Sequence, residues 1–335
     1  METMQACVLR KPGPLAGNPL VLEELPIPIP GPGEVLLKVL ACGVCRTDLH
    51  IAMGELPQKL NPLIPGHQIV AEVVDGNHSE LPAGSRVGVS WVGGTDGTCR
   101  YCQTDRENLC DDPTFTGYTH NGGFAEYTTA RADFLLPLPD KLSDINAAPL
   151  LCAGIIGFRS LHVAEVKHGQ KVGLFGFGSS AQLMLKVLHA WDCGVYVSTR
   201  GENHRALARE LGAEWVGSET EMPPELLDSA ITFAPSGDVV VAALRSIAKG
   251  GIVAINAIHL DRIPQFDYDT LLWEERSLRS VANMTREDGH NFLQVAASIN
   301  LTPSVQTFSL SQANEALRMI YEDKSSSSVV LLPHG

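Results

Sequence analysis

The chain has 335 residues, which is enough for about two domains of ordinary size. Its 25 basic and 38 acidic residues give a net charge of −13, which argues against nucleic-acid binding because that binding depends on cationic contacts to phosphate. No stretch approaches the roughly 20 apolar residues of a membrane span, and the N-terminus lacks the apolar segment of a signal peptide. We therefore expect a cytoplasmic protein without nucleic-acid or membrane partners.

The first 150 residues are rich in Gly and Pro and contain short β-like runs, such as Val35–Leu40, Ile69–Val74 and Arg86–Ser90. Turn residues separate these runs, so the pattern predicts an irregular, mostly β domain with long loops.

Three potential metal ligands stand far apart in this part of the chain, at Cys45, His67 and Cys152. Two thiolates and one imidazole, with a fourth position left open, are typical of a catalytic zinc site. The alternative is that each residue is an ordinary core side chain, and the spacing alone leaves both interpretations open.

A second cluster is compact and has the pattern D-x-x-C-x-x-C-x7-C, formed by Asp96, Cys99, Cys102 and Cys110. Four ligands that close one loop are typical of a structural zinc site. The alternatives are three free thiols or a disulfide. In a reducing compartment this spacing indicates metal binding.

From about Ala147 strand-like runs alternate with helix-like ones: Lys171–Phe175, Ala181–Trp191, Val195–Thr199 and Asn203–Leu211. This alternation predicts βαβ units and a parallel sheet. The tail ends in the β-like run SVVLLP, which we expect to fold back onto the first domain.

A glycine-rich turn joins the first strand of this region to its helix. Gly176, Gly178 and Ala181 form G-x-G-x-x-A, with Ser179 and Ser180 at the predicted helix start. The first glycine permits the tight turn, the second lets the backbone approach a pyrophosphate, and the helix N-terminus attracts phosphate. The pattern predicts a dinucleotide site, although a plain strand-to-helix turn would look similar.

The next strand ends in Thr199 and Arg200, where NAD-specific domains carry a carboxylate for the ribose 2′-hydroxyl. Arginine supplies a planar, permanently charged group that suits phosphate, and His204 follows within the next helix. These residues favour NADP, while NAD remains open.

Together the motifs resemble those of the zinc-containing medium-chain alcohol dehydrogenases, especially the yeast-like and bacterial branch. They occur in the family's order along nearly the whole chain: GVCRTDLH, PGH, WVGGTDGTCRYC, GYTHNGGFAEY, PLLCAG and the glycine-rich turn. The resemblance implies an α/β fold in which a doubly wound parallel Rossmann sheet, residues 154–289, interrupts a GroES-like, mostly β catalytic domain. That domain would comprise residues 1–153 and 290–335.

The resemblance also implies roles for single residues. Thr47 would touch the bound alcohol, His50 would end a proton relay, Asp48 would lie behind the zinc ligands, and Trp91 would line the substrate pocket. Two zinc ions per subunit and NADP or NAD are the expected cofactors, small alcohols or aldehydes the substrates, and a homodimer or homotetramer the assembly.

Two positions depart from the family pattern. Gln68 follows the zinc-binding His67 where a carboxylate is usual, and Asp96 replaces the first cysteine of the structural site. A carboxylate is itself an accepted zinc ligand. Alternative functions are a zinc-free quinone or enoyl reductase on the same fold and a zinc- and nucleotide-binding protein without enzymatic activity. The first would leave Cys45, His67 and Cys152 unused together.

Overall fold

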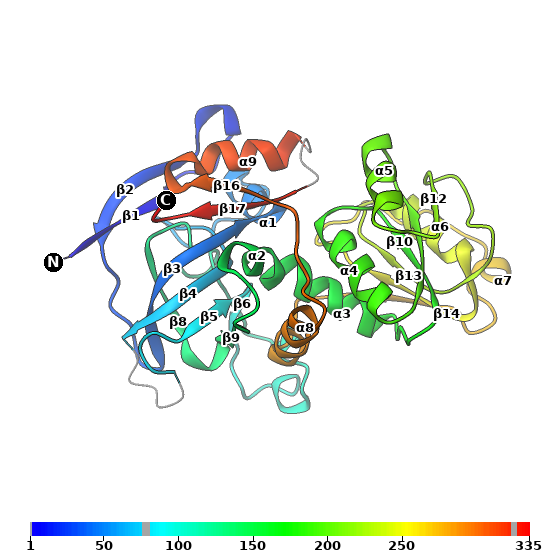
Figure 1. Cartoon of the computed structure of the whole chain (residues 1–335), viewed down its shortest axis with the longest axis horizontal. Helices are drawn as coiled ribbons and strands as arrows, with labels where there is room; N and C mark the ends of the chain where they lie inside the picture. The colour runs from blue at the N-terminus through cyan, green and yellow to red at the C-terminus, as the bar shows by residue number, and fades with distance from the viewer. Residues whose placement is uncertain (1, 76–80, 323–326) are drawn as a thin grey trace. The chain divides into compact units, whose positions relative to one another are not determined.

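The computed structural model describes residues 2–75, 81–322 and 327–335. The chain forms two compact units (Figure 1): residues 1–152 with 283–335, and residues 153–282. The sequence motifs predict the second boundary after residue 289. In the structure α8 (Arg286–Ser298) packs on β9 (Leu136–Pro137) of the first unit, so the chain has re-entered that unit before the helix begins.

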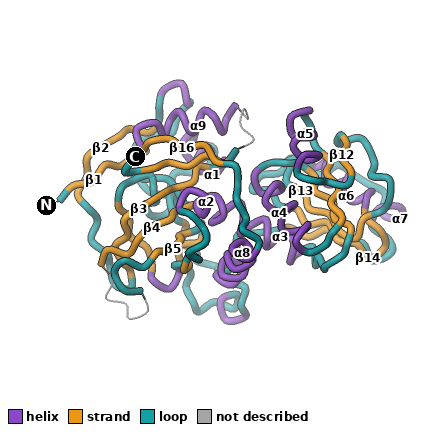
Figure 2. Tube along the Cα trace, in the orientation of Figure 1, coloured by secondary structure: helices purple, strands orange, loops and turns teal. Residues whose placement is uncertain are grey.

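The second unit contains a six-stranded sheet in the order β12-β11-β10-β13-β14-β15, with every pair parallel. Its strands are β10 (Lys171–Phe175), β11 (Gly194–Ser198), β12 (Trp215–Gly217), β13 (Leu227–Thr232), β14 (Ile247–Ile255) and β15 (Ser277–Ser280). Its helices are α3 (Ile155–Val163), α4 (Ser179–Ala190), α5 (Glu202–Glu210), α6 (Gly237–Ser246) and α7 (Tyr268–Leu271). The predicted parallel α/β fold is confirmed. Figure 2 shows the helices and strands of this unit.

The strand order reverses between β10 and β13, and ligands of such sheets bind at this switch point, outside the carboxyl ends of the strands. Strand β10 is buried along most of its length because it is central in the sheet. The glycine-rich turn follows it directly, so the sequence motif lies at the expected ligand-binding edge.

The first unit is built on a seven-stranded sheet in the order β16-β17-β3-β4-β5-β9, with β8 also paired to β3. The remaining strands form two small two-stranded sheets, β1-β2 and β6-β7. The strands besides β9 are β1 (Thr3–Leu9), β2 (Leu20–Pro26), β3 (Glu34–Val44), β4 (Gln68–Asp75), β5 (Arg86–Val89), β6 (Val92–Gly94), β7 (Thr114–Phe115), β8 (Tyr127–Arg131), β16 (Val305–Ser309) and β17 (Ser328–Leu332). The helices besides α8 are α1 (Arg46–Met53), α2 (Asp144–Pro149) and α9 (Ala313–Glu322).

Strand β3 is the central strand of this sheet. Its residues alternate between fully and partly buried from Glu34 to Ala41 and are then continuously buried to Val44, because β4, β8 and β17 all pair with it. The C-terminal strand β17 lies beside β3 in Figure 1, which confirms that the tail folds back onto the first domain. None of the helices in the described ranges is long and apolar enough to cross a membrane.

Candidate active site and metal centres

Three segments of the first unit converge on one largely buried point. Cys45 lies between the end of β3 and the start of α1, and His67 directly precedes β4. Cys152 lies in a π-helical turn, Leu150–Gly154, that follows α2. The ligand atoms of the three side chains lie within 4.8 Å of one another, and Cys45 Sγ is 3.3 Å from His67 Nε2. The structure therefore brings the predicted triple together.

Asp48 contacts the segments that carry Cys45 and His67 and orients the His67 ring. Its fully buried carboxylate accepts hydrogen bonds from the backbone N–H groups of Cys45 (2.9 Å) and Gly66 (3.1 Å) and contacts His67 Nδ1 at 3.1 Å. Because Nδ1 is engaged, the imidazole presents Nε2 to the two thiols. A carboxylate on the far nitrogen of a histidine is the usual way to orient a metal-binding imidazole.

The thiols and the imidazole also tune one another electrostatically. A hydrogen bond with Cys152 lowers the pKa of the Cys45 thiol well below its ordinary value, and His67 adds to the effect. Burial alone would lower the pKa of His67, but the charges of Asp48 and Cys45 outweigh burial and raise it. The site thus favours an anionic sulfur beside a cationic partner, which is the electrostatic setting that a bound metal cation would supply.

The loop that carries His67 is held by a glycine-rich segment from elsewhere in the chain. Gly122, Gly123 and Phe124 donate backbone hydrogen bonds to the carbonyls of residues 64–66 at 2.7–2.9 Å. A Cβ atom on Gly122 would lie 2.0 Å from the Gly66 carbonyl oxygen, so only glycine fits this close approach. The motif GGF is therefore a support for the metal-ligand loop.

Trp91 stands beside His67, with their ring centroids 5.2 Å apart in an edge-to-face arrangement. Its indole stacks on Phe115 at 4.8 Å and on Tyr118 at 5.8 Å, and the Tyr118 hydroxyl donates to the Pro57 carbonyl at 2.8 Å. Phe115 and Tyr118 were not predicted from sequence as site residues. These aromatic residues fix the Trp91 ring in one orientation.

Thr47 and His50 lie three positions apart on α1, so they share one face of the helix. Thr47 is buried, and its backbone N–H donates to Cys45 Sγ at 3.3 Å. His50 is half-buried, and its Nδ1 contacts the carboxylate of Glu55, which the sequence analysis did not single out.

Gln68 is buried at the start of β4 opposite Gly43. A Cβ atom on Gly43 would lie 3.0–3.1 Å from the Gln68 side chain, so glycine at position 43 makes room for this amide.

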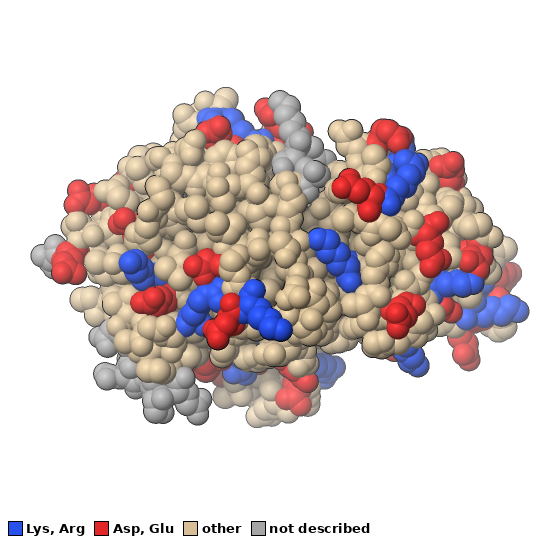
Figure 3. Space-filling model, viewed as in Figure 1, with Lys and Arg blue, Asp and Glu red and all other residues tan. Residues whose placement is uncertain are grey.

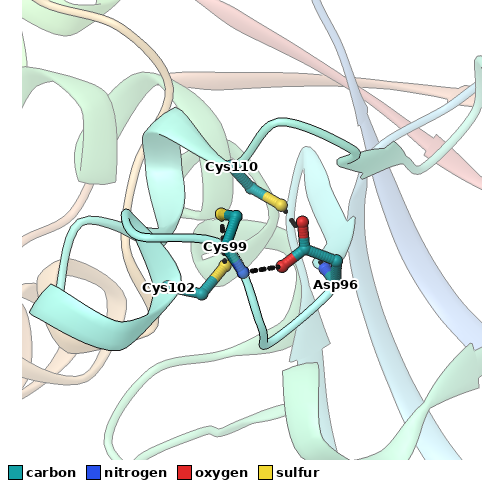
Figure 4. Close-up of side chains that lie close together, drawn as sticks. All are labelled: Asp96, Cys99, Cys102 and Cys110. Atoms are coloured by element: carbon teal, nitrogen blue, oxygen red, sulfur yellow. Dashed lines mark hydrogen bonds between the residues drawn. The ribbon is translucent and has the colours of Figure 1, made fainter.

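The second cluster forms a separate lobe of the first unit. The ligand atoms of Asp96, Cys99, Cys102 and Cys110 lie within 4.8 Å of one another, and the Asp96 carboxylate points toward the sulfur atoms (Figure 4). Asp96 Oδ1 accepts backbone hydrogen bonds from Thr98 at 2.7 Å and Cys99 at 2.9 Å. These bonds lower the pKa of Asp96, that from Cys99 most, so the carboxylate is anionic and ready to bind a cation.

This lobe also grips the segment where the chain re-enters the first unit. Glu107 accepts hydrogen bonds from the backbone N–H of Arg286 (2.7 Å) and from its guanidinium (2.6–3.0 Å). Asn283 donates to the Asn108 carbonyl at 3.0 Å. The ion pair could not be predicted from sequence because its members are far apart in the chain.

In the second unit the glycine-rich turn leaves room for a ligand. Gly176 adopts φ +94°, and a Cβ atom there would lie 2.9 Å from the backbone nitrogen of Ala234, so glycine is required. Gly178 has open space around its Cβ position and caps α4 without a side-chain hydrogen bond. The N–H groups of Ser179 and Ser180 at this helix start suit a phosphate.

The end of β11 carries the residues predicted to read the ribose. Thr199 is buried, and its backbone N–H donates to the Gly217 carbonyl at the end of β12. Arg200 is exposed and pairs with Glu219, and His204 is half-buried in α5. Glu219 was not identified from sequence, because β12 was not among the predicted strands.

Comparison with known proteins adds an independent line of evidence. Residues 31–140 match the model of the alcohol dehydrogenase GroES-like domain. A protein of Mycobacterium tuberculosis (strain CDC 1551 / Oshkosh), named "Probable alcohol dehydrogenase AdhA", is 42% identical over 98% of this chain and 97% of its own length.

Solved structures share the fold over the whole chain. The acetophenone reductase of Geotrichum candidum NBRC 4597 in complex with NAD has a TM-score of 0.84 and 26% identity, covering 99% of this chain and 98% of its own. A thermostable alcohol dehydrogenase from Pyrobaculum aerophilum, solved with cobalt and zinc bound, has a TM-score of 0.88 and 21% identity, covering 99% and 100%. Sequence, fold and the match to the GroES-like domain agree, and the chain belongs to the alcohol dehydrogenase family.

Proposed function

We propose that this oxidoreductase interconverts small primary or secondary alcohols with aldehydes or ketones by hydride transfer to or from NAD(P), with zinc at Cys45, His67 and Cys152. One observation carries the proposal: two thiols and an imidazole with its Nε2 presented converge in a buried site backed by Asp48. This donor set fits zinc, because thiolate and imidazole are its preferred ligands and three protein ligands leave a position open.

The chemistry divides between cofactors and side chains. Bound zinc would polarise the alcohol oxygen and lower the pKa of its proton, and the nicotinamide would accept the hydride. Thr47, next to the ligand Cys45, would accept the proton from the alcohol oxygen. His50, held by Glu55, would pass a proton to solvent. Trp91, fixed against Phe115, would limit the width of the alcohol beside His67.

A second zinc fits the lobe of Asp96, Cys99, Cys102 and Cys110. Four ligands without an open position suit a structural ion, and the oxygen of Asp96 would complete the set of three sulfurs. We infer that this ion closes the loop.

The second unit fits a dinucleotide. The open space at Gly178 and the uncapped start of α4 would receive the pyrophosphate, and Thr199, Arg200 and His204 would face the adenosine ribose. Zinc together with NADP or NAD is thus the cofactor set.

We further propose a homodimer or homotetramer. Strand β15 forms one edge of the six-stranded sheet, and such an edge needs protection or a partner. The aromatic side chains of Tyr268 and Trp273, which precede it in the chain, are more than half exposed.

We place the activity in the cytoplasm, because all eight cysteines are free thiols.

Initial-rate kinetics over a panel of primary and secondary alcohols, with NAD and with NADP, test the function. Alcohol-dependent cofactor reduction with two zinc ions per subunit is expected. Reduction of quinones or enoyl compounds without zinc would favour the reductase alternative. Stoichiometric zinc and nucleotide binding without turnover of any alcohol or aldehyde would favour the non-enzymatic one.

The role of His50 has its own test. His50→Gln should lower kcat less than tenfold, since water can replace the outer end of a relay, and added imidazole buffer should restore the rate. A loss as complete as that of Cys45→Ser, without rescue by imidazole, would contradict this role.

A further inference from the structure

The carboxyl ends of β11 and β12 lie side by side at the ligand-binding edge of the second unit. The strands are parallel, with Ser198 opposite Gly217, and the Ser198 hydroxyl donates to the Ser218 carbonyl at 3.1 Å. Residues just beyond Gly217 are therefore held next to Thr199 and Arg200, where the ribose of a dinucleotide would be read.

Glu219 uses this position to pair with Arg200. Its Oε1 lies 3.2 Å from Arg200 Nε, with the Arg200 side chain 79% exposed and the Glu219 side chain 28% exposed. The carboxylate is thus the more buried partner, while the guanidinium extends into solvent. The strand end that lacks a carboxylate at Thr199 receives one from its neighbour.

The other arginines of this corner are paired differently. Arg205 bonds to Glu202 at 2.9 and 3.1 Å and to the Thr199 carbonyl at 3.3 Å, and Arg209 also pairs with Glu202. Figure 3 shows acidic and basic side chains gathered over α5, consistent with these pairs. Arg200, in contrast, takes its counter-charge from the end of the adjacent strand.

We propose that Glu219 is a specificity-determining residue for the ribose 2′ group, an inference that rests on the proposed use of NAD(P). A 2′-phosphate that paired with Arg200 would have to compete with the Glu219 carboxylate and would meet its negative charge. A 2′-hydroxyl carries no charge and can donate a hydrogen bond to the same carboxylate. Glu219 therefore shifts the selectivity of the enzyme toward NAD, against the pull of Arg200 toward NADP.

The test is the dissociation constant of the whole protein for NADH and for NADPH, measured by cofactor fluorescence. Glu219→Gln should strengthen NADPH binding relative to NADH at least fivefold. Glu221→Gln is the matched control. Glu221 lies two positions from Glu219, and its carboxylate accepts a hydrogen bond from the Ser218 backbone N–H. The substitution removes the same charge, and it should change NADPH binding relative to NADH by less than twofold. Unchanged melting temperatures would verify that both variants fold.

A double-mutant cycle separates the ion pair from a general charge effect. Glu219→Gln should change the ratio of the NADPH and NADH dissociation constants in both backgrounds. The fold-change in the Arg200→Gln background should be less than half of that in the wild-type background. A ratio within twofold of wild type for Glu219→Gln, or an equal change for Glu221→Gln, would overturn the inference while leaving the proposed function intact. A wild-type protein that bound neither cofactor would overturn both.

Discussion

The two cysteine clusters of the first unit use similar ligands in opposite settings. Cys45, His67 and Cys152 come from distant segments of the chain, whereas the ligands of the Asp96 lobe lie within one short stretch. Around the first cluster the fold itself supplies the order: Asp48 takes three hydrogen bonds, and the segment after Gly122 holds the His67 loop. The lobe has mainly local turns and its contact to Arg286.

This difference separates chemistry from stability. A buried site that the surrounding fold already organises can lose a ligand and keep its shape. A loop that is held mainly by local turns and by its metal ligands depends on the bound metal for its folding free energy. We therefore expect substitutions in the first cluster to abolish turnover and substitutions in the lobe to lower stability.

The largest expected effect is on turnover at the buried cluster. Cys45→Ser, His67→Ala and Cys152→Ser should each lower kcat/KM by more than about a thousandfold, or roughly 4 kcal/mol of barrier. Circular dichroism should show a native fold. Cys42→Ala is the matched control, a buried thiol three positions from Cys45 that lies outside the ligand set, and it should stay active. Activity within tenfold of wild type in any of the three ligand variants would refute the assignment.

Substitutions in the Asp96 lobe should lower zinc content and stability rather than turnover. Asp96→Ala should lower zinc content from two ions to about one per subunit and lower the melting temperature, whereas Asp96→Cys should retain both ions. Asp112→Ala, an exposed carboxylate just beyond the last ligand, serves as the control and should change neither quantity. Finding a single zinc per subunit in the active wild type would show that the lobe binds none.

The contacts between the lobe and residues 283–286 should make a smaller contribution, and this contribution is to the free energy of unfolding. Glu107→Gln leaves Arg286 without its anionic partner and should cost about 2 kcal/mol of unfolding free energy, within the range for charged hydrogen bonds. Burial raises the pKa of Glu107, but the bonds from Arg286 outweigh this and lower it. The stability it confers is therefore present above the unfolded pKa of about 4.3 and is lost as pH falls through the lower folded value.

Urea titrations at pH 7 and near pH 3 check this prediction. The difference between Glu107→Gln and wild type should be larger at pH 7. An equal difference at both values would mean that the ion pair does not contribute the stability.

The smallest effect concerns the substrate side of the buried cluster. Trp91→Ala should raise the rate on branched or aromatic alcohols relative to ethanol by about tenfold, because it removes the ring that stands beside His67. Tyr118→Phe keeps the stack but removes the bond to Pro57, and it should change that ratio less than Trp91→Ala does. An unchanged ratio in Trp91→Ala would mean that the ring does not face the substrate.

Sequence patterns predicted the parts of this molecule that depend on local order. The run Lys171–Phe175 gave the strand β10 with the predicted bounds, because a central strand reads as an apolar run ended by glycine. The compact D-x-x-C-x-x-C-x7-C pattern predicted which side chains of the Asp96 lobe meet. The spacing of Cys45, His67 and Cys152 alone left their meeting open, and the family motifs predicted it. The functional roles of these residues stay predictions.

What the sequence could not predict depends on contacts between distant segments. Phe115 and Tyr118 become neighbours of Trp91 only when β6 pairs with β7. Glu219 reaches Arg200 only because β12 lies beside β11, and β12 has three residues, too few to show a periodic pattern. Such partners have no fixed spacing in sequence and appear only in three dimensions.

The pairing of β17 with β3 makes the Cys45 site depend on a contact between segments that lie far apart in the sequence. Val329–Leu331 pair with Cys42–Val44, so the strand that leads into Cys45 receives one of its neighbours from a distant part of the chain. Closing so long a loop costs chain entropy before the contact forms. We therefore expect this edge of the sheet to form late in refolding, and variants that lack β17 to leave the strand before Cys45 without this neighbour.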